Sequence, residues 1–102
     1  MIKIWNYGEY SNDNYGSCRA VSIGDITLYF SYNTIVAFSI GYKLTISENV
    51  WSNTTGKHLN FINPNKSIRT PYEEFKKKLE NLEKVIDIIT KDIEDKILIE
   101  TL

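Results

Sequence analysis

The sequence predicts an α+β fold: an antiparallel β-meander of four to five strands, a short polar-capped helix, and a long C-terminal amphipathic helix packed on the sheet. Short segments rich in β-branched and aromatic residues fill the first half of the chain. The links between them are too short for parallel crossovers. Beyond residue 70, apolar residues recur at steps of three and four, the spacing of one helical face. With 102 residues the chain has material for one core, so we expect a single domain over residues 1–102.

The predicted strands lie between about residues 2 and 51 and are separated by residues that favour turns. Glycine, asparagine and aspartate tolerate left-handed backbone or bond to their own backbone, so Gly24-Asp25, Tyr32-Asn33 and Gly41-Tyr42 mark tight turns. Residues 9–17 form a longer loop by the same argument. The expected strand sequences are IKIW, CRAVSI, ITLYFS, TIVAFSI and KLTISENVW.

A short helix is expected at about residues 55–62, after a cluster of hydroxyl side chains. Thr54 or Thr55 would cap it, and Pro64 would follow its end. Backbone amides at the start of a helix favour anions, so a phosphate or a carboxylate could bind beside Lys57.

The long helix is expected at about residues 71–93. Thr70 supplies a hydroxyl for the N-cap, Pro71 occupies the first helical position, and Glu73 lies three residues after the cap. Two explanations of its apolar stripe remain open. The stripe covers one face of the sheet, or it joins two copies of the chain as a heptad seam. The seam residues would be Leu79, Leu82, Ile86, Ile89 and Ile93.

The length of this helix bears on both explanations. From Tyr72 to Ile93 it would extend about 32 Å at 1.5 Å per residue. A domain of this size has a radius of gyration of only about 13 Å. Either the helix breaks near Thr90, with residues 95–102 forming a last turn or an edge strand, or its far end overhangs and packs on a partner chain.

The composition excludes several classes of protein. No apolar run reaches the roughly 20 residues that cross a bilayer, and the first residues lack a signal peptide, so we expect a cytoplasmic protein with no membrane partner. Cys18 is the one cysteine and is expected to be a small packing residue. One histidine and one cysteine do not make a standard zinc site, and Gly56-Lys57-His58 departs from the Walker loop. We therefore expect no metal and no cofactor.

The charges are distributed unevenly. Residues 71–102 carry six lysines and nine acids, a balance of −3, whereas no acid occurs between Glu48 and Glu73. That interval is locally basic and can attract an anionic partner. We expect it to be a contact surface that faces water, and the candidate binding residues are Trp51, Ser52, Thr54, Thr55, Lys57, His58, Lys66 and Arg69.

His58 and the aromatic residues near it allow further hypotheses. His58 could be the general base of a small enzyme, because nearby hydroxyls could act with it. The alternative is that His58 only caps or hydrogen-bonds a loop, and we name no catalytic residue. Rings interleaved with cations, such as Trp51 and Phe61 with Lys57 and Arg69, also suit weak binding of single-stranded nucleic acid.

The run TIVAF, the segment VWSNTTGKHLN, Arg69 and the helix YEEFKKKLE resemble a small domain that recurs in uncharacterised proteins of tailed bacteriophages and prophages. The resemblance covers about residues 28–82. It implies an accessory protein of a phage or mobile element, acting inside a bacterial host cell.

These observations lead to one functional hypothesis with alternatives. We expect a non-catalytic accessory protein that binds a host protein or complex, for example as an inhibitor of a host defence or replication component. The alternatives are a weak nucleic-acid-binding protein that uses residues 51–69 and a small enzyme that uses His58. A homodimer through the C-terminal helix is also open.

Overall fold

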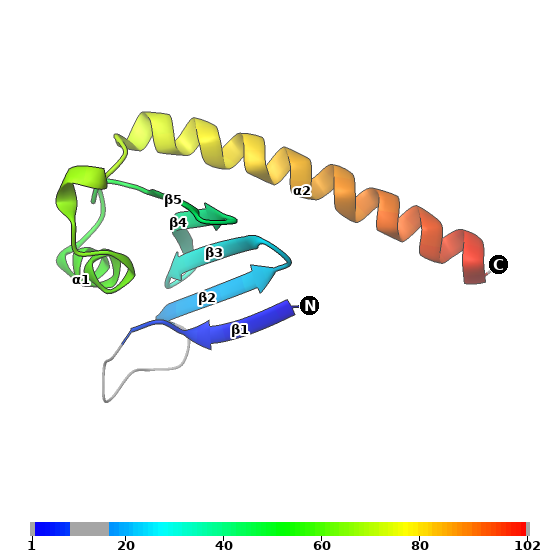
Figure 1. Cartoon of the computed structure of the whole chain (residues 1–102), viewed down its shortest axis with the longest axis horizontal. Helices are drawn as coiled ribbons and strands as arrows, with labels where there is room; N and C mark the ends of the chain where they lie inside the picture. The colour runs from blue at the N-terminus through cyan, green and yellow to red at the C-terminus, as the bar shows by residue number, and fades with distance from the viewer. Residues whose placement is uncertain (1, 9–16, 102) are drawn as a thin grey trace.

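The computed structural model describes residues 2–8 and 17–101, with side chains as far as Lys96. Five strands form one antiparallel sheet in the order β1-β2-β3-β4-β5 (Figure 1). Each strand pairs with its neighbours in sequence, so the predicted meander and the α+β class are confirmed. The strands are β1 (Ile2–Asn6), β2 (Cys18–Ile23), β3 (Ile26–Ser31), β4 (Thr34–Ile40) and β5 (Lys43–Ile46).

Three tight turns connect β2 to β5 at the predicted positions. Gly24, Tyr32 and Gly41 all have φ between 55° and 60°. Glycine adopts this left-handed backbone without strain, whereas Tyr32 adopts it at a steric cost because it has a Cβ. The strands end earlier than expected, at Ile46, and the loop predicted at residues 9–17 lies outside the described residues except for Ser17.

The two faces of the sheet carry different sets of side chains. Leu28 and Phe38 lie on one face, while Tyr29 and Ala37 lie on the other. The pairing of β3 with β4 shifts by one residue after Tyr29, so Ile35 joins the face of Phe38. Cys18 is fully buried, as predicted for a packing residue.

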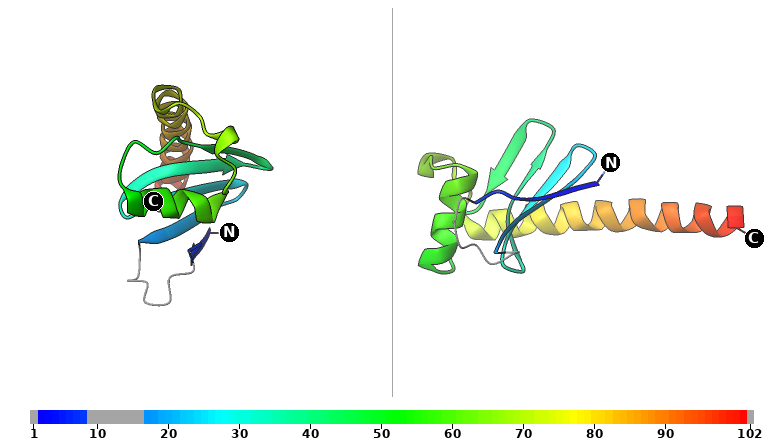
Figure 2. Two further views of the ribbon diagram at one scale, coloured as in Figure 1. Left: turned by 90° about the vertical axis from the view of Figure 1, so that its left-hand side faces the viewer. Right: turned by 90° about the horizontal axis from the view of Figure 1, so that it is seen from below.

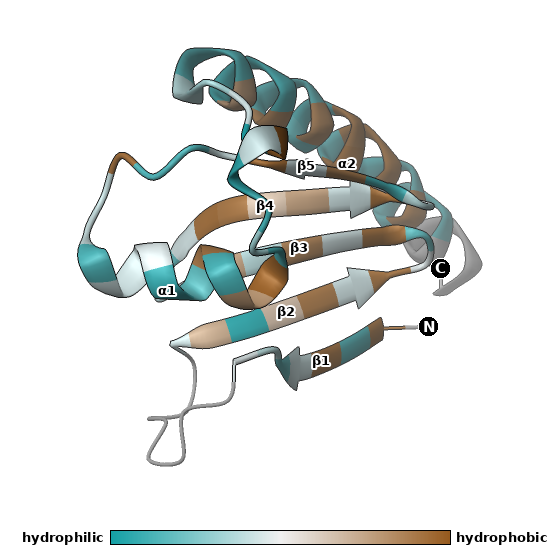
Figure 3. Ribbon diagram, turned by 60° about the vertical axis from the view of Figure 1, so that its left-hand side comes forward, coloured by the Kyte–Doolittle hydropathy of each residue, from teal (hydrophilic) through white to brown (hydrophobic). Residues whose placement is uncertain are grey.

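One helix covers part of each face (Figure 3). The short helix α1 (Asn53–Ile62) places Leu59 against Val36, Ala37 and Ile46. The long helix α2 (Tyr72–Thr101) places Phe75 and Leu82 against Phe38 on the opposite face. A short 3-10 turn, η1 (Lys66–Ile68), connects the two helices.

The helix α2 is longer than predicted and does not break near Thr90. It continues as helix to Thr101, which also assigns residues 95–101 to helix rather than to an edge strand. Its second half extends past the sheet (Figures 1 and 2). The longest dimension of the molecule is 50 Å, although the radius of gyration is 15.4 Å. The overhang is therefore confirmed.

Both helices begin at a residue other than the predicted one. The cap of α1 is Ser52, whose Oγ accepts from Thr55 N at 3.2 Å, so the assignment to Thr54 or Thr55 was wrong. The first intrahelical bond of α2 runs from Phe75 N to Pro71 O. This makes Pro71 the residue before the helix. Thr70 cannot take the capping position because its own backbone is bonded to the end of β5.

Candidate functional site

The candidate segment 51–69 folds as α1 and the turn after it. The Ser52 cap starts the helix two residues before the predicted start, at Asn53. Residues Thr55, His58 and Leu59 then share one helical face, because side chains three and four positions apart lie together. That face packs on the sheet, and all three residues are buried.

Thr55 and His58 belong to a buried polar cluster with Ser31 of β3. Ser31 Oγ is hydrogen-bonded to Thr55 Oγ1 at 2.9 Å and to His58 Nδ1 at 2.7 Å. The ring of Tyr32 lies 5.6 Å from that of His58, measured between centroids. The prediction that this whole corner faces water was therefore wrong for Thr55 and His58. The cause is that both side chains share the face of α1 that carries Leu59 and packs on the sheet, where Ser31 supplies their hydrogen-bond partner.

The distance between Ser31 and His58 is that of a nucleophile and its base. However, His58 is 1% exposed and Ser31 is 2% exposed, so a substrate in solution cannot reach either group. The cluster ties α1 to β3 across the sheet surface. This arrangement fits the hydrogen-bonding role that was the alternative to catalysis.

The exposed part of the segment forms a basic hollow of about 250 Å³. Lys57 comes from α1, Lys66 from η1, and Arg69 from the strand-like link to α2. No acidic side chain is among the residues that line it. The lining residues are Asn49, Asn53, Gly56, Lys57, Asn60, Lys66 and Arg69.

Arg69 is held in place by the end of α1. Its Nη2 donates to Asn60 Oδ1 at 3.2 Å and to Asn63 O at 3.0 Å. Burial lowers the pKa of the Arg69 guanidinium from its ordinary value, and Nε is buried with no hydrogen-bond partner among the described residues. An arginine fixed in this way presents its charge at a defined position, whereas Lys57 and Lys66 are exposed and adjustable.

Asn49 and Gly56 shape the rim of the hollow. Asn49 Nδ2 donates to Ser52 O at 2.9 Å, and Asn49 Oδ1 accepts from Trp51 N at 3.0 Å. A Cβ on Gly56 would lie 2.9 Å from Asn49 Nδ2, which is too close. Gly56 therefore lets the asparagine cover the first turn of α1.

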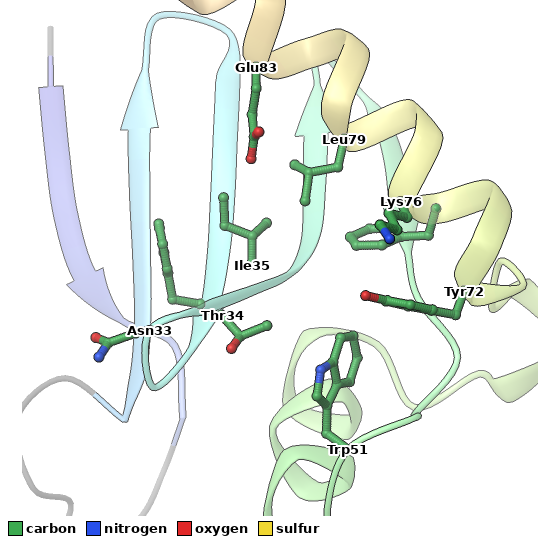
Figure 4. A pocket seen from close by; sticks show the side chains of 10 residues that line it. Asn33, Thr34, Ile35, Trp51, Tyr72, Lys76, Leu79 and Glu83 are labelled. Atoms are coloured by element: carbon green, nitrogen blue, oxygen red, sulfur yellow. The ribbon is translucent and has the colours of Figure 1, made fainter.

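Trp51 lies outside the hollow, in an aromatic cleft between the sheet, the start of α1 and α2 (Figure 4). Its indole meets the ring of Tyr72 edge-on, with centroids 5.6 Å apart. The cleft has a volume of about 230 Å³, below the roughly 300–1,000 Å³ of typical small-molecule sites. Trp51 thus contributes to packing at the edge of the core. The lining residues are Phe30, Asn33, Thr34, Ile35, Trp51, Tyr72, Phe75, Lys76, Leu79 and Glu83.

The structure divides the predicted binding residues into four groups. Lys57, Lys66 and Arg69 come together, whereas Trp51 lies in the cleft. Thr55 and His58 are buried, and Ser52 and Thr54 are exposed at the start of α1. Sequence reasoning missed the asparagines of the hollow. The signal for two of them was the helical spacing of Asn53, Lys57 and Asn60, which places these three residues on one face of α1.

The predicted dimer seam is also divided. Leu79, Leu82 and Ile86 pack against the chain's own sheet, so they are not available as a seam, and the prediction was wrong for them. Ile89 and Ile93 continue the same stripe but are about half exposed. The apolar stripe therefore covers the sheet with the first half of α2 and is exposed in the second half.

No described helix is both long enough and apolar enough to cross a membrane. Among residues 2–8 and 17–101, no group of three histidine, cysteine or acidic side chains could hold a metal ion.

A comparison with protein families identifies one match. Residues 3–77 match the model of a family of unknown function, DUF8033. This range spans more than half of the chain, so the chain belongs to that family. No curated protein and no solved structure matches significantly.

Proposed function

We propose that this member of a family of unknown function is a non-catalytic binding protein whose contact surface is the basic hollow. The observation that carries the proposal is the convergence of Lys57, Lys66 and Arg69 on one surface that no acid lines. Three cations on one patch attract an acidic partner and orient it during association.

A protein partner fits this surface better than single-stranded nucleic acid does. Binding of single strands needs exposed rings between the cations, on which bases stack. His58 is buried and Trp51 packs against Tyr72. Of the rings considered for stacking, Phe61 is exposed, at 39%. The asparagines of the hollow instead offer hydrogen-bond donors and acceptors for a protein surface.

The burial of the Ser31–His58 pair supports binding over catalysis. A general base must come within hydrogen-bond reach of the proton that it abstracts. Both side chains lie beneath α1, and the described pockets lined by residues of the segment are surface hollows away from them. We therefore assign the pair a structural role.

The resemblance to a phage and prophage domain supports a partner in a bacterial host cell. Within the proposal, the chain is an accessory protein that occupies an acidic surface of a host defence or replication component.

The test is a pull-down from a bacterial host lysate with the tagged full-length chain, with and without nuclease. We expect captured protein that resists nuclease and is lost with the double variant Lys57→Glu/Lys66→Glu. The matched control is Lys77→Glu/Lys84→Glu, which changes the net charge equally on the exposed side of α2.

Two results would count against this proposal. Capture that disappears with nuclease would identify nucleic acid as the partner. Equal capture by the charge-reversed protein and its control would exclude the hollow as the contact surface.

A further inference from the structure

The face of the sheet that α2 covers is only partly covered. Phe75, Leu79 and Leu82 of α2 lie over β3 and β4, and Leu82 also borders β5. The strands β1 and β2 lie beyond this cover. On the same face, Ile2 and Ile4 are 66% exposed and Ile23 is 46% exposed. We call the apolar surface formed by Ile2, Ile4, Val21 and Ile23 the open strip.

The second half of α2 carries an apolar stripe that no sheet of its own chain covers. Ile89 and Ile93 follow Leu82 and Ile86 at helical spacing, and they are 49% and 52% exposed. Val85 and Ile88 widen this surface and are also exposed. We call residues 87–101 the overhang. Figures 1 and 2 show it leaving the sheet as one straight helix.

The two surfaces match in size. Two strands about 4.8 Å apart make a strip about 10 Å wide, and six residues of β2 make it about 20 Å long. A helix with its side chains is about 10–12 Å wide, and residues 87–101 extend about 22 Å. One overhang therefore fits one open strip. Within one chain they cannot meet, because α2 is a continuous helix that carries the overhang away from its own sheet.

Their charges are also complementary. Residues 87–96 carry four acids (Asp87, Asp92, Glu94, Asp95) and two lysines (Lys91, Lys96), a balance of −2. On the face of the open strip, β1 and β2 carry one cation, Arg19, and no acid, because Lys3 lies on the opposite face. Arg19 pairs with Phe30 across the sheet and so lies on the face of the open strip. Asp87 and Glu94 follow one flank of the apolar stripe and offer carboxylates to this cation.

From these observations we infer that the occupant of the open strip is the overhang of a second copy of this chain. The dimer has a two-fold axis near the point where α2 leaves its own sheet. Each α2 then covers its own β3–β5 with its first half and the partner's β1–β2 with its second half. Both contacts form twice, as the symmetry of an isologous dimer requires.

The area of this contact predicts a weak dimer. Half the side of a helix about 10 Å wide and about 22 Å long is roughly 350 Å², and the open strip is roughly 200 Å². Each copy thus buries roughly 550 Å², near the lower limit for a stable interface, which is about 1,200 Å² in total. Dissociation is expected on dilution through the micromolar range.

Sedimentation equilibrium of the full chain over that range tests the inference. We expect the mass to rise from 11.8 kDa toward twice that value. Ile93→Asp in the overhang and Ile4→Asp in the open strip should each weaken the dimer at least about tenfold, with an unchanged circular dichroism spectrum. The controls are Lys91→Asp, on the opposite side of α2, and Lys3→Asp, on the opposite face of β1. Both should still dimerise.

A monomeric mass at every concentration would overturn the inference, and so would a dimer that survives Ile4→Asp. Disulfide cross-linking separates this arrangement from a seam between two helices. A mixture of Ile4→Cys and Ile93→Cys proteins should give a covalent heterodimer. Cross-linking of Ile93→Cys alone, without the mixed product, would contradict the proposed contact. The native Cys18 is buried and does not compete.

Discussion

Ser31→Ala tests the structural role of the buried polar cluster. The Ser31 hydroxyl bonds both Thr55 Oγ1 and His58 Nδ1, at 2.9 and 2.7 Å. Without it, His58 Nδ1 loses its bond to β3, and removing one side of a buried hydrogen bond costs about 1–3 kcal/mol. Thr55 Oγ1 keeps its hydrogen bond to the Ser52 hydroxyl at 3.3 Å, so Thr55 contributes less to the loss of stability. We expect a loss of about 2 kcal/mol in the free energy of unfolding.

The assay is urea unfolding followed by circular dichroism, in which the midpoint falls while the slope stays constant. The matching thermal shift is about 4–8 °C for each kcal/mol in a domain of this size. Ser22→Ala is the control, because Ser22 lies on the same face of the sheet and its hydroxyl is exposed, 3.4 Å from Gly24 O. It should change stability by less than about 0.5 kcal/mol. A loss that small for Ser31→Ala would refute the role given to the cluster.

Three further tests address individual elements of the fold. Glu48→Ala removes the side chain that accepts from Tyr72 N at 3.0 Å and should cost about 1 kcal/mol of stability, as other lost caps do. Thr70→Ala keeps the backbone bonds of Thr70 and should cost under about 0.5 kcal/mol in the same urea titration. A larger loss for Thr70→Ala than for Glu48→Ala would restore Thr70 as the cap. Gly24→Ala places a Cβ in a turn with φ of 58° and should cost about 1–2 kcal/mol of stability. Gly24→Asn should cost less in a thermal melt, because asparagine tolerates this backbone. Equal losses for the two variants would exclude backbone strain as the cause. Phe75→Ala removes a ring that is 1% exposed and should lower the free energy of unfolding by about 3–5 kcal/mol. A loss below about 1 kcal/mol, measured by chemical denaturation, would show that α2 does not cover the sheet.

Most of the fold could be predicted from local pattern. Alternating apolar residues and short turns specify a meander, because hairpin links leave few alternatives for neighbouring strands. The stripe from Phe75 to Ile93 gives the helix and its buried face. The sequence could not show where that face stops being covered, because this depends on the width of the sheet and on the angle at which α2 crosses it.

The caps were less predictable because they depend on contacts distant in sequence. Thr70 satisfies every local rule for an N-cap. In the structure its N–H donates to Ile46 O, and its carbonyl accepts from Glu48 N. These bonds hold Thr70 beside β5, and Glu48, 24 residues before Tyr72, supplies the cap instead. A pairing of this kind has no signature within a window of a few residues.

The sequence predicted only part of the candidate site, because the rest depends on contacts that are distant in sequence. The absence of acids between Glu48 and Glu73 correctly indicated a basic surface, and Lys57, Lys66 and Arg69 lie together on it. Whether His58 faced water depended on the phase of α1. Thr55 and His58 lie four positions and one position before Leu59, so they share the face that packs on the sheet. The partner that receives them there is Ser31 of β3, which is distant in sequence and leaves no local signal.

The most direct test of the proposed contact surface is nuclear magnetic resonance of the labelled chain titrated with a short polyglutamate peptide. The account predicts saturating shifts of the amides of Gly56, Lys57, Asn60 and Arg69, residues that all line the basic hollow. The lysine-bearing outer side of α2, represented by Lys77 and Lys84, should stay unchanged. Shifts spread equally over both groups, or confined to α2, would contradict the claim that the hollow is where this protein meets its partner.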